Sequence, residues 1–246
     1  MDKSPLEKVP RLNSLGLRRT AGSSGDAMHL VLASASPRRK ELMALTGWQV
    51  ALQPVEVDET LRPGEDARAV TRRLAMAKAA AAHRTSPAGA VILAADTIVA
   101  DVRGVLGKPG SHAEARTMLQ RLRGGRHVVV SSLAVLGPDG FPLLEDSCAT
   151  EVPMRAYTEA EIDSFVTSGA AGDKAGAYSI QDPGFRPVDE SSLAGCYANV
   201  MGLPLCHVVR TLRRRGIEPA QSVPSACQAH TGYACPVYER ILRGES

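Results

Sequence analysis

A predicted strand-to-helix junction near the N-terminus, at Pro37, carries four residues that could bind an anion: Ser34, Ser36, Arg38 and Arg39. Pro37 suits the first position of a helix, and Ser36 suits its N-cap. Cations in the first helical turn oppose the helix macrodipole, so the arginine pair needs another reason for its position. Free backbone N–H groups, serine hydroxyls and guanidinium groups together can hold a phosphate chain. A solvated arginine pair on a surface helix is the alternative.

Carboxylates gather at two later points. An acidic loop, Glu56, Asp58 and Glu59, follows a strand predicted over residues 48–52. Asp96 ends the apolar run 90–95, which is typical of a central strand covered on both faces. An acid at the carboxyl end of such a strand lies where open α/β sheets place their chemistry. A capping role is disfavoured because residues 98–100 continue as strand.

Two lysines complete the set of candidate residues. Lys78 lies at the edge of the apolar stripe of a helix predicted over residues 65–83, and a lysine that only extends to solvent is the alternative there. Lys108 is presented by a Gly-Lys-Pro loop. Cations beside carboxylates suggest an anionic substrate bound through a divalent metal, since Mg²⁺ is held by one or two carboxylates plus substrate phosphates. Metal-assisted attack of water on a polyphosphate fits these residues.

Two other classes of nucleotide-binding protein, P-loop motors and dinucleotide dehydrogenases, are disfavoured. The sequence contains neither GxxxxGK[ST] nor a GxGxxG that follows a strand. A basic nucleic-acid-binding body is also disfavoured, because residues 1–27 and 210–246 carry net charges of +2 and +3 in a chain of net charge +3. The segment between them is therefore slightly acidic.

The segments that would position these residues alternate between helix and strand. The stripe of the 65–83 helix is predicted to comprise Val70, Leu74, Ala77 and Ala81. Two later helices are predicted from capping boxes at Ser111/Glu114 and Thr158/Glu161, and a hairpin is predicted over residues 126–136 and 141–154. A glycine-containing loop over 172–181 follows. Short β-like pieces around 196–200 and a helix that begins at Pro204 complete the predicted elements. No periodic pattern follows Pro219.

Length, hydrophobic content and cysteine count indicate a globular chain without a disulfide framework. With 246 residues and 44% hydrophobic content, it can bury the core of one large domain or of two lobes. Its five cysteines are odd in number and form no CxxC pair, which fits a reducing cytosol. Cys227, His230 and Cys235 are too irregularly spaced to predict a zinc site. No apolar run approaches the roughly 18 residues that a membrane helix needs.

The two ends are predicted to lie outside the folded domain. Residues 1–27 mix Ser, Gly, Pro and Arg without apolar periodicity and are predicted to be a disordered leader. Met28, directly before the first strand, offers an alternative start codon. The domain is predicted over residues 28–216, followed by a C-terminal tail over 217–246.

Seven motifs in order resemble the Maf family of nucleoside triphosphate pyrophosphatases: ASASPRRKEL, EVDET, AMAKA around Lys78, AADTIV, LGKP, GDKAGAYSIQ and NVMGLPL. The resemblance implies an α/β fold like that of the inosine triphosphate pyrophosphatases, with a mixed twisted sheet in two lobes and a central substrate cleft. It implies hydrolysis of a nucleoside triphosphate to the monophosphate and pyrophosphate, with Mg²⁺ or Mn²⁺ as cofactor. Asp96 matches the family's proton acceptor, although it could equally position the metal.

The resemblance also implies roles for the other candidates. Ser34, Arg38, Arg39, Lys78 and Lys108 would bind the triphosphate, and Glu59 would hold the metal together with Asp96. Arg38, Thr97 and Gln181 match the subgroup that acts on dTTP and UTP, and an amide such as Gln181 can donate to and accept from a pyrimidine edge. Asp182-Pro183 departs from the glycine-rich sequence expected there.

The expected function is therefore cytoplasmic removal of dTTP, UTP and modified pyrimidine nucleotides, which limits their incorporation into nucleic acid. A homodimer is compatible with this function, and no nucleic-acid or membrane partner is expected. Two alternatives stay open: 7-methyl-GTP pyrophosphatase activity in the same family, and a non-catalytic inhibitor of septum formation that acts by binding a partner.

Overall fold

A six-stranded mixed sheet organises the computed structural model, which describes residues 29–245. The strand order is β2-β1-β3-β5-β6, and β4 pairs with β3. β1 is parallel to β2 and β3, whereas the pairs on the other side of β3 are antiparallel. The predicted α/β class with a mixed sheet is confirmed, while the predicted leader lies outside the described residues. The strands are β1 (Leu30–Ala33), β2 (Val50–Leu52), β3 (Val91–Asp101), β4 (Gly104–Leu106), β5 (Arg126–Leu136) and β6 (Pro142–Pro153).

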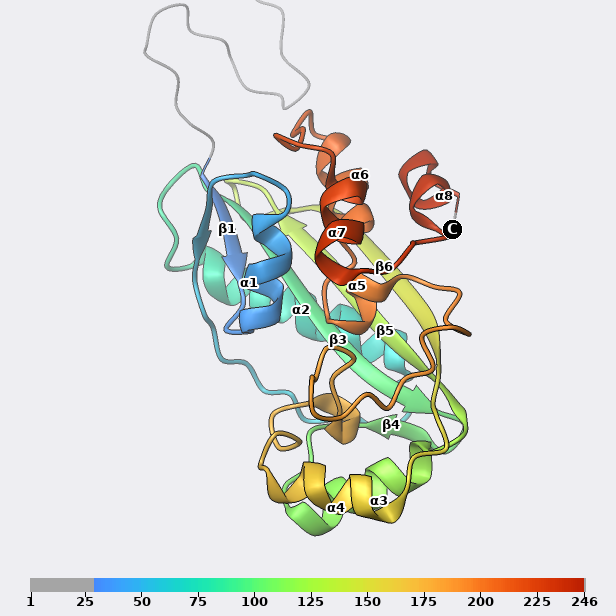
Figure 1. Ribbon diagram of the computed structural model, residues 1–246. Helices are drawn as coiled ribbons and strands as arrows, with labels where there is room; N and C mark the ends of the chain where they lie inside the picture. Colours follow the sequence, from blue (N-terminus) through green and yellow to red (C-terminus); the bar gives the residue numbers. More distant parts are fainter. Residues whose placement is uncertain (1–28, 246) are drawn as a thin grey trace, which may run out of the picture.

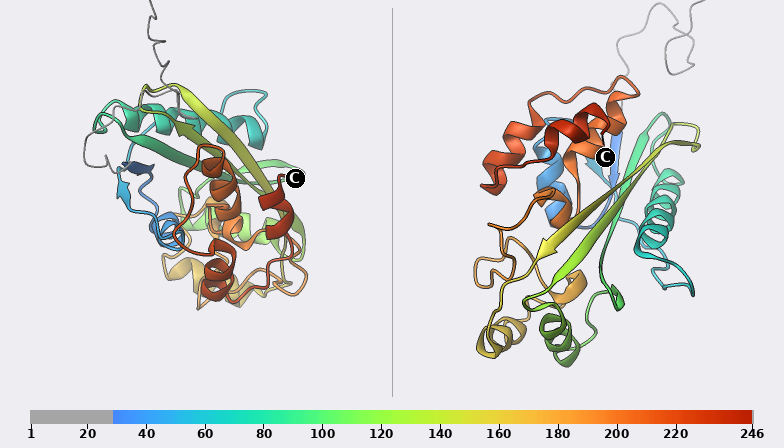
Figure 2. Two further views of the ribbon diagram at one scale, coloured as in Figure 1. Left: turned by 90° about the horizontal axis from the view of Figure 1, so that it is seen from above. Right: turned by 90° about the vertical axis from the view of Figure 1, so that its right-hand side faces the viewer.

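Helices cover both faces of this sheet (Figures 1 and 2). One face is covered by α2 (Ala67–His83), which packs on β3 and β5. The opposite face carries α1 (Pro37–Ala44), α5 (Tyr197–Val200), α6 (Leu205–Arg213), α7 (Val223–Thr231) and α8 (Tyr238–Arg243). At the far end of the long strands lie α3 (His112–Leu122), α4 (Glu159–Thr167) and a short 3₁₀ turn, η1 (Ala175–Ala177).

The local signals in the sequence explain most of these elements. Ser36 caps α1 by accepting from the backbone N–H of Arg39 at 3.5 Å. The capping box of α4 forms as predicted. In α3 only half of the predicted box forms, because Glu114 accepts from the backbone of Gly110 and not of Ser111. The buried face of α3 is the predicted one: Ala115, Met118, Leu119 and Leu122.

The buried face of α2 differs from the predicted stripe. Val70 and Leu74 are buried as expected, but Ala77 and Ala81 are only half-buried. The helix lies across two strands, and its small alanines allow a wide contact face, so the core side includes Thr71, Ala75, Ala79 and Ala82. This orientation puts Lys78 at the edge of the helix's contact with the sheet.

The predictions for the last fifty residues were wrong at two places. The β-like pieces around residues 196–200 are instead the short helix α5, whose Asn199 amide donates to the carbonyl of Val129 at 2.9 Å and to the hydroxyl of Thr150 at 3.0 Å. Beyond Pro219, where no pattern was recognised, α7 and α8 form. Each buries a single side chain, Val223 and Ile241 respectively, which is too little for a periodic signal.

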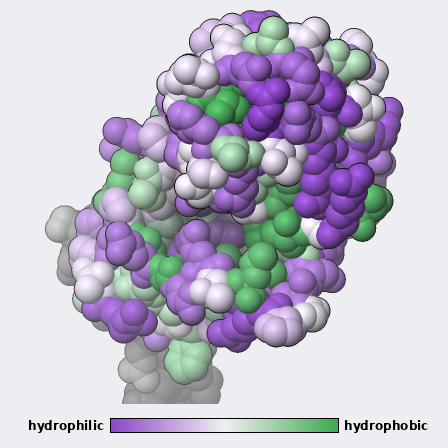
Figure 3. Space-filling view, turned by 90° about the horizontal axis from the view of Figure 1, so that it is seen from below, coloured by the Kyte–Doolittle hydropathy of each residue, from purple (hydrophilic) through white to green (hydrophobic). Residues whose placement is uncertain are grey.

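The surface is mainly hydrophilic at the end that carries α3 and α4 (Figure 3). The exposed large apolar side chains of the described residues lie in four separate loops or strand ends: Leu52, Leu61, Val102 and Phe141. None of the helices within residues 29–245 combines the length and the apolar character required to cross a bilayer.

A buried ion pair joins β6 to the C-terminal helices. Arg210 in α6 donates to both carboxylate oxygens of Asp146, at 2.8 and 2.7 Å, and also to the carbonyl of Ile241 in α8 at 3.2 Å. Burial raises the pKa of Asp146, but hydrogen bonds from His207 and Arg210 outweigh it and hold that pKa well below its usual range. The ionised carboxylate therefore stabilises the fold.

We expect Asp146→Asn to lower the free energy of unfolding by about 2 kcal/mol at pH 7, because it weakens charged hydrogen bonds of a buried guanidinium. A carboxyl with a depressed pKa contributes stability above its unfolded pKa and loses it as the pH falls through the folded value. The difference between wild type and variant should therefore shrink below about pH 4. Urea unfolding at pH 7 and pH 3 measures it. The carboxylate of Glu145 pairs with Arg72 at the surface. The matched variant Glu145→Gln should therefore lower the free energy of unfolding by less than about 1 kcal/mol. An equal decrease in both variants would contradict the argument.

Candidate active site

The centre of the site is a short stretch of β3 that has a neighbouring strand on one side only. β1 pairs with β3 as far as Ala94, and β4 pairs with it from Val99 onward. Residues 95–98 therefore have β5 as their only strand neighbour among the described residues. Asp96 ends the apolar run but not the strand: β3 continues to Asp101, as the strand predicted over residues 98–100 requires, and Asp96 lies just past the carboxyl end of the parallel part of the sheet.

Asp96 and Thr97 project from opposite faces of the sheet at this opening. Successive side chains of a strand alternate between faces. The neighbours of Asp96 along the same face, Ala94 and Ile98, pack in the clusters that include α2. Val99, on the same face as Thr97, packs in the large core on the other side. A ligand lying at the open edge could thus contact both faces at once.

On the α2 face, Lys78 joins two carboxylates. Its Nζ lies 2.5 Å from Oδ1 of Asp96 and 2.7 Å from Oε1 of Glu59. Lys108 lies 3.8 Å from the second carboxylate oxygen of Glu59. The structure therefore brings together four of the predicted residues from three loops or helices and the central strand.

Burial dominates the electrostatics of Asp96, which is 5% exposed. It raises the pKa of this carboxyl above the usual 3.8, although the positive charges of Lys78 and Arg39 oppose the rise. Glu59 behaves in the opposite way: burial raises its pKa, but the hydrogen bond and charge of Lys78 outweigh burial and lower it. Two neighbouring carboxyls thus differ in their affinity for a proton.

The other members of the acidic loop do not join this cluster. Asp58 is exposed and accepts from the backbone N–H of Thr60 at 2.9 Å. Glu56 is also exposed.

Arg39 lies beside the open edge of β3, on the side of Thr97. Its guanidinium donates to the carbonyl of Ala95 at 2.8 Å, to the hydroxyl of Thr97 at 3.0 Å and to the carbonyl of Gly202 at 2.8 Å. Thr97 also bonds the carbonyl of Gly202 at 3.1 Å and the hydroxyl of Ser131 at 2.8 Å. Burial lowers the pKa of Arg39, partly offset by the charge of Asp96. The sequence predicted a substrate contact for Arg39 and gave no sign of these backbone contacts.

Arg38 is arranged differently from its neighbour. It is half-buried, and its guanidinium has no hydrogen bond to any of residues 29–245. Ser34 accepts from the backbone N–H of Ser36 at 3.2 Å, so it shapes the turn into α1. Gln181 is half-buried at the end of the glycine-containing loop.

That loop brings a charged pair which the sequence reasoning did not single out. Lys174 lies 2.6 Å from Asp173, and the nearby charge of Arg38 also favours ionised Asp173. The backbone N–H of Gly176 donates to the carbonyl of Gly107 at 3.0 Å, so this loop is tied to the loop that presents Lys108. Two adjacent opposite charges in a glycine-containing segment were the available signal.

The donor set at Asp96 and Glu59 suits a divalent cation. Two carboxylates already converge on a positive charge, the ammonium of Lys78. Mg²⁺ commonly takes one or two carboxylates and completes its ligands with water and substrate phosphates. Within residues 29–245 no group of three or more His, Cys, Asp or Glu side chains is arranged to hold a metal by itself, so substrate and water would supply the remaining ligands.

Comparison with known proteins gives consistent matches. The family described as Maf-like protein matches residues 29–215. A dTTP/UTP pyrophosphatase of Dehalococcoides mccartyi is 38% identical over 200 residues, which cover 80% of this chain and 86% of that protein. Another, from Anaeromyxobacter dehalogenans, is 43% identical over 196 residues, or 77% and 95% of the two chains. Among solved structures, a HAM1 protein from Coxiella burnetii matches at 15% identity with a TM-score of 0.43, over 84% of this chain and 100% of that one.

Proposed function

The chain belongs to the Maf family, and from this premise we propose that it is a nucleoside triphosphate pyrophosphatase that hydrolyses dTTP and UTP. The observation that carries the proposal is the convergence of Asp96, Glu59 and Lys78 at an open edge of the central strand. Relatives that cover more than three quarters of the chain bear the name dTTP/UTP pyrophosphatase.

The reaction is attack of water on the α-phosphorus, which releases pyrophosphate and leaves the nucleoside monophosphate. Asp96 accepts the proton of the attacking water. Glu59 and Asp96 would hold Mg²⁺ or Mn²⁺, which would neutralise charge on the phosphates and lower the pKa of a bound water. Lys78 and Lys108, which lie beside Glu59, would bind the phosphates from the α2 side, and Ser34 and Arg38 would reach the nucleotide from the turn into α1.

Base selection falls to the opposite side of the opening. Arg38, Thr97 and Gln181 come from α1, β3 and the glycine-containing loop. Asp96 and Thr97 project to different faces, so we place the phosphates near the α2 face and the base toward the other. This division allows one nucleotide to contact both sets of residues.

The alternatives are less well supported. The relatives named above bear the name dTTP/UTP pyrophosphatase, and Arg38, Thr97 and Gln181 match the subgroup that the resemblance associates with those two nucleotides. Nothing in the described part of the chain favours a non-catalytic septum inhibitor. We expect the enzyme to act in the cytoplasm, where free thiols persist, because Cys148, Cys196, Cys206, Cys227 and Cys235 are all unpaired in the structure.

A product assay tests this function. Purified protein with Mg²⁺ is incubated in ¹⁸O-labelled water with dTTP, UTP, CTP, GTP, ITP and 7-methyl-GTP, and pyrophosphate is measured separately from orthophosphate. We expect pyrophosphate from dTTP and UTP at rates at least about tenfold above the others, since a mismatched polar pocket costs more than 1.4 kcal/mol. The label should appear in the monophosphate. Preference for 7-methyl-GTP would overturn the base assignment, and absence of hydrolysis would overturn the activity.

A further inference from the structure

Lys78 occupies the position between Asp96 and Glu59 at which a divalent cation would bind. We propose that its ammonium holds this cation position in the nucleotide-free enzyme and gives it up, moving to the triphosphate, when the metal arrives with the substrate. The inference rests on the proposed function for its metal requirement. It assigns Lys78 a role in setting metal affinity, in addition to any contact with phosphate.

The geometry favours a shared position over two separate contacts. One Nζ atom lies 2.7 Å from a Glu59 oxygen and 2.5 Å from an Asp96 oxygen, so both carboxylates point at the same point in space. The side chains of Lys78 and Asp96 are 12% and 8% exposed. A charge in such a position is only weakly screened by solvent.

The chain also permits Lys78 to leave. The backbone of Lys78 belongs to α2, whose alanines pack on the sheet, so the helix itself is fixed. Its ammonium, in contrast, sits on a flexible four-carbon stem. Glu59 comes from a loop and is half exposed, with Lys108 near its other oxygen. Rotation of one side chain therefore frees both carboxylates without rearranging the fold.

A consequence for the order of binding follows. A divalent cation alone must displace an ammonium from two carboxylates and leave that ammonium without an anionic partner. A metal–nucleotide complex brings the phosphates that would receive it. Lys78 thus disfavours binding of metal without substrate and couples the two ligands.

The competing interpretation is that Lys78 only orients the carboxylates. In that case its removal would loosen Asp96 and Glu59, and metal affinity would stay the same or fall. The two interpretations predict opposite signs for the same measurement.

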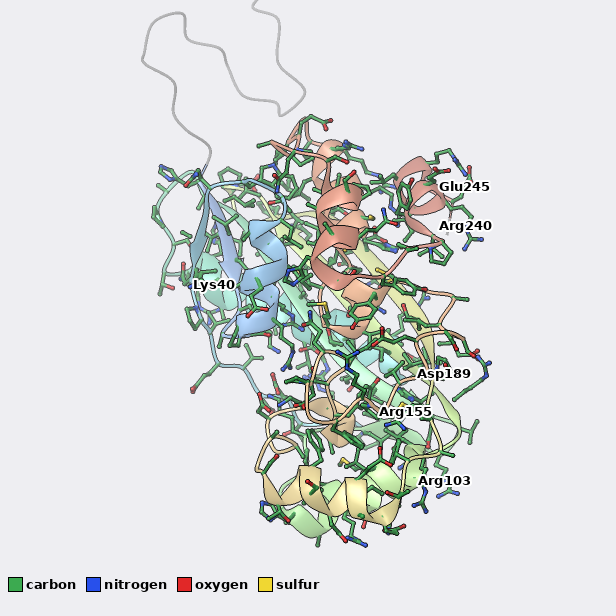
Figure 4. The ribbon with its side chains drawn as sticks, in the orientation of Figure 1. Lys40, Arg103, Arg155, Asp189, Arg240 and Glu245 are labelled. Atoms are coloured by element: carbon green, nitrogen blue, oxygen red, sulfur yellow. The ribbon has the colours of Figure 1, made fainter. Side chains whose placement is uncertain are left out.

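The test is a titration of nucleotide-free protein with Mn²⁺, in which the concentration of free Mn²⁺ is measured by electron paramagnetic resonance. We expect Lys78→Met to bind Mn²⁺ at least tenfold more tightly than wild type, because an ammonium no longer competes for the carboxylates. Lys40→Met is the matched control: Lys40 is exposed on α1 (Figure 4), and its removal changes the net charge equally. The Mn²⁺ affinity of Lys40→Met should stay within twofold of the wild-type affinity. Equal or weaker Mn²⁺ binding by Lys78→Met would overturn the proposal.

Thermal unfolding with and without Mn²⁺ supplies a second readout. Mn²⁺ should raise the unfolding temperature of Lys78→Met more than that of wild type, because metal then compensates a buried carboxylate. Lys78→Gln, which keeps a hydrogen-bond donor, serves if the Met variant does not fold. The double variant Lys78→Met/Glu59→Gln should lose most of the additional rise in unfolding temperature that Mn²⁺ causes in Lys78→Met. If that additional rise persisted, the Mn²⁺ would be bound at another site, which would contradict the proposal. Since no nucleotide is present, failure here is distinct from failure of the product assay.

Discussion

Asp96→Asn is expected to lower turnover at least about a hundredfold while leaving the protein folded, a scale usual for a proton acceptor or an electrostatic group. The amide keeps the size of the carboxylate but neither accepts a proton at neutral pH nor supplies charge to a metal. The side chain lies at the unpaired edge of β3, in contact with Lys78. Single-turnover hydrolysis of dTTP measures the loss without interference from product release.

The fold should tolerate this substitution because burial raises the pKa of Asp96. A carboxyl whose pKa is raised in the folded state binds its proton more tightly there than in the unfolded chain. Its ionised form therefore costs stability at neutral pH, and that cost disappears as the pH falls. We expect the unfolding temperature of Asp96→Asn to lie within about 3 °C of wild type, which corresponds to less than about 1 kcal/mol at this chain length.

The same raised pKa fixes the acid limb of wild-type activity. Only ionised Asp96 can accept a proton, so kcat/KM, which reports the free enzyme, should fall as the pH drops through a value above the ordinary 3.8. Asp189→Asn is the matched control, because Asp189 lies on a surface loop and accepts from Ser191 and Ser192 (Figure 4). That variant should keep wild-type turnover and its pH profile. Near wild-type turnover in Asp96→Asn would remove Asp96 from the mechanism.

Local signals made the elements around Asp96 predictable from the sequence. Ser36 and Pro37 define the start of α1, and the apolar run 90–95 defines β3, because capping and burial act over a few residues. Capping boxes and a hairpin turn located α3, α4, β5 and β6 in the same way. The Maf motifs then gathered Lys78, Glu59 and Asp96 into one site, and the structure does bring these three together.

The remaining features depend on contacts distant in sequence. The opening in the sheet edge exists because β1 stops at Ala33 and the antiparallel strand β4 stops at Leu106, and neither strand end reveals its pairing partner. The contact between Arg39 and the carbonyl of Gly202 spans 163 residues. α7 and α8 have too few buried side chains for any periodic pattern, and tertiary packing stabilises them.

Arg39→Lys is expected to lower the free energy of unfolding by about 3 kcal/mol and kcat by at least about tenfold, with little change in KM. The guanidinium makes three hydrogen bonds in a fixed fork, to Ala95, Thr97 and Gly202. An ammonium keeps the charge but cannot reproduce this fork, and each charged hydrogen bond is worth roughly 1.5–3 kcal/mol. Because these bonds fix the edge of β3, their loss should displace Asp96 from its working position.

The neighbouring Arg38 provides the matched control for Arg39. It belongs to the same helix turn, and its side chain makes no hydrogen bond to any of residues 29–245. Arg38→Lys should change the unfolding free energy by less than about 0.5 kcal/mol, as is usual for a side chain without specific contacts, and should raise KM for dTTP. Urea unfolding and steady-state kinetics of the two variants distinguish a positioning residue from a substrate ligand. If Arg39→Lys were as stable as wild type and raised KM alone, Arg39 would contact the triphosphate as the sequence predicted, and its backbone contacts would not be what holds the site together.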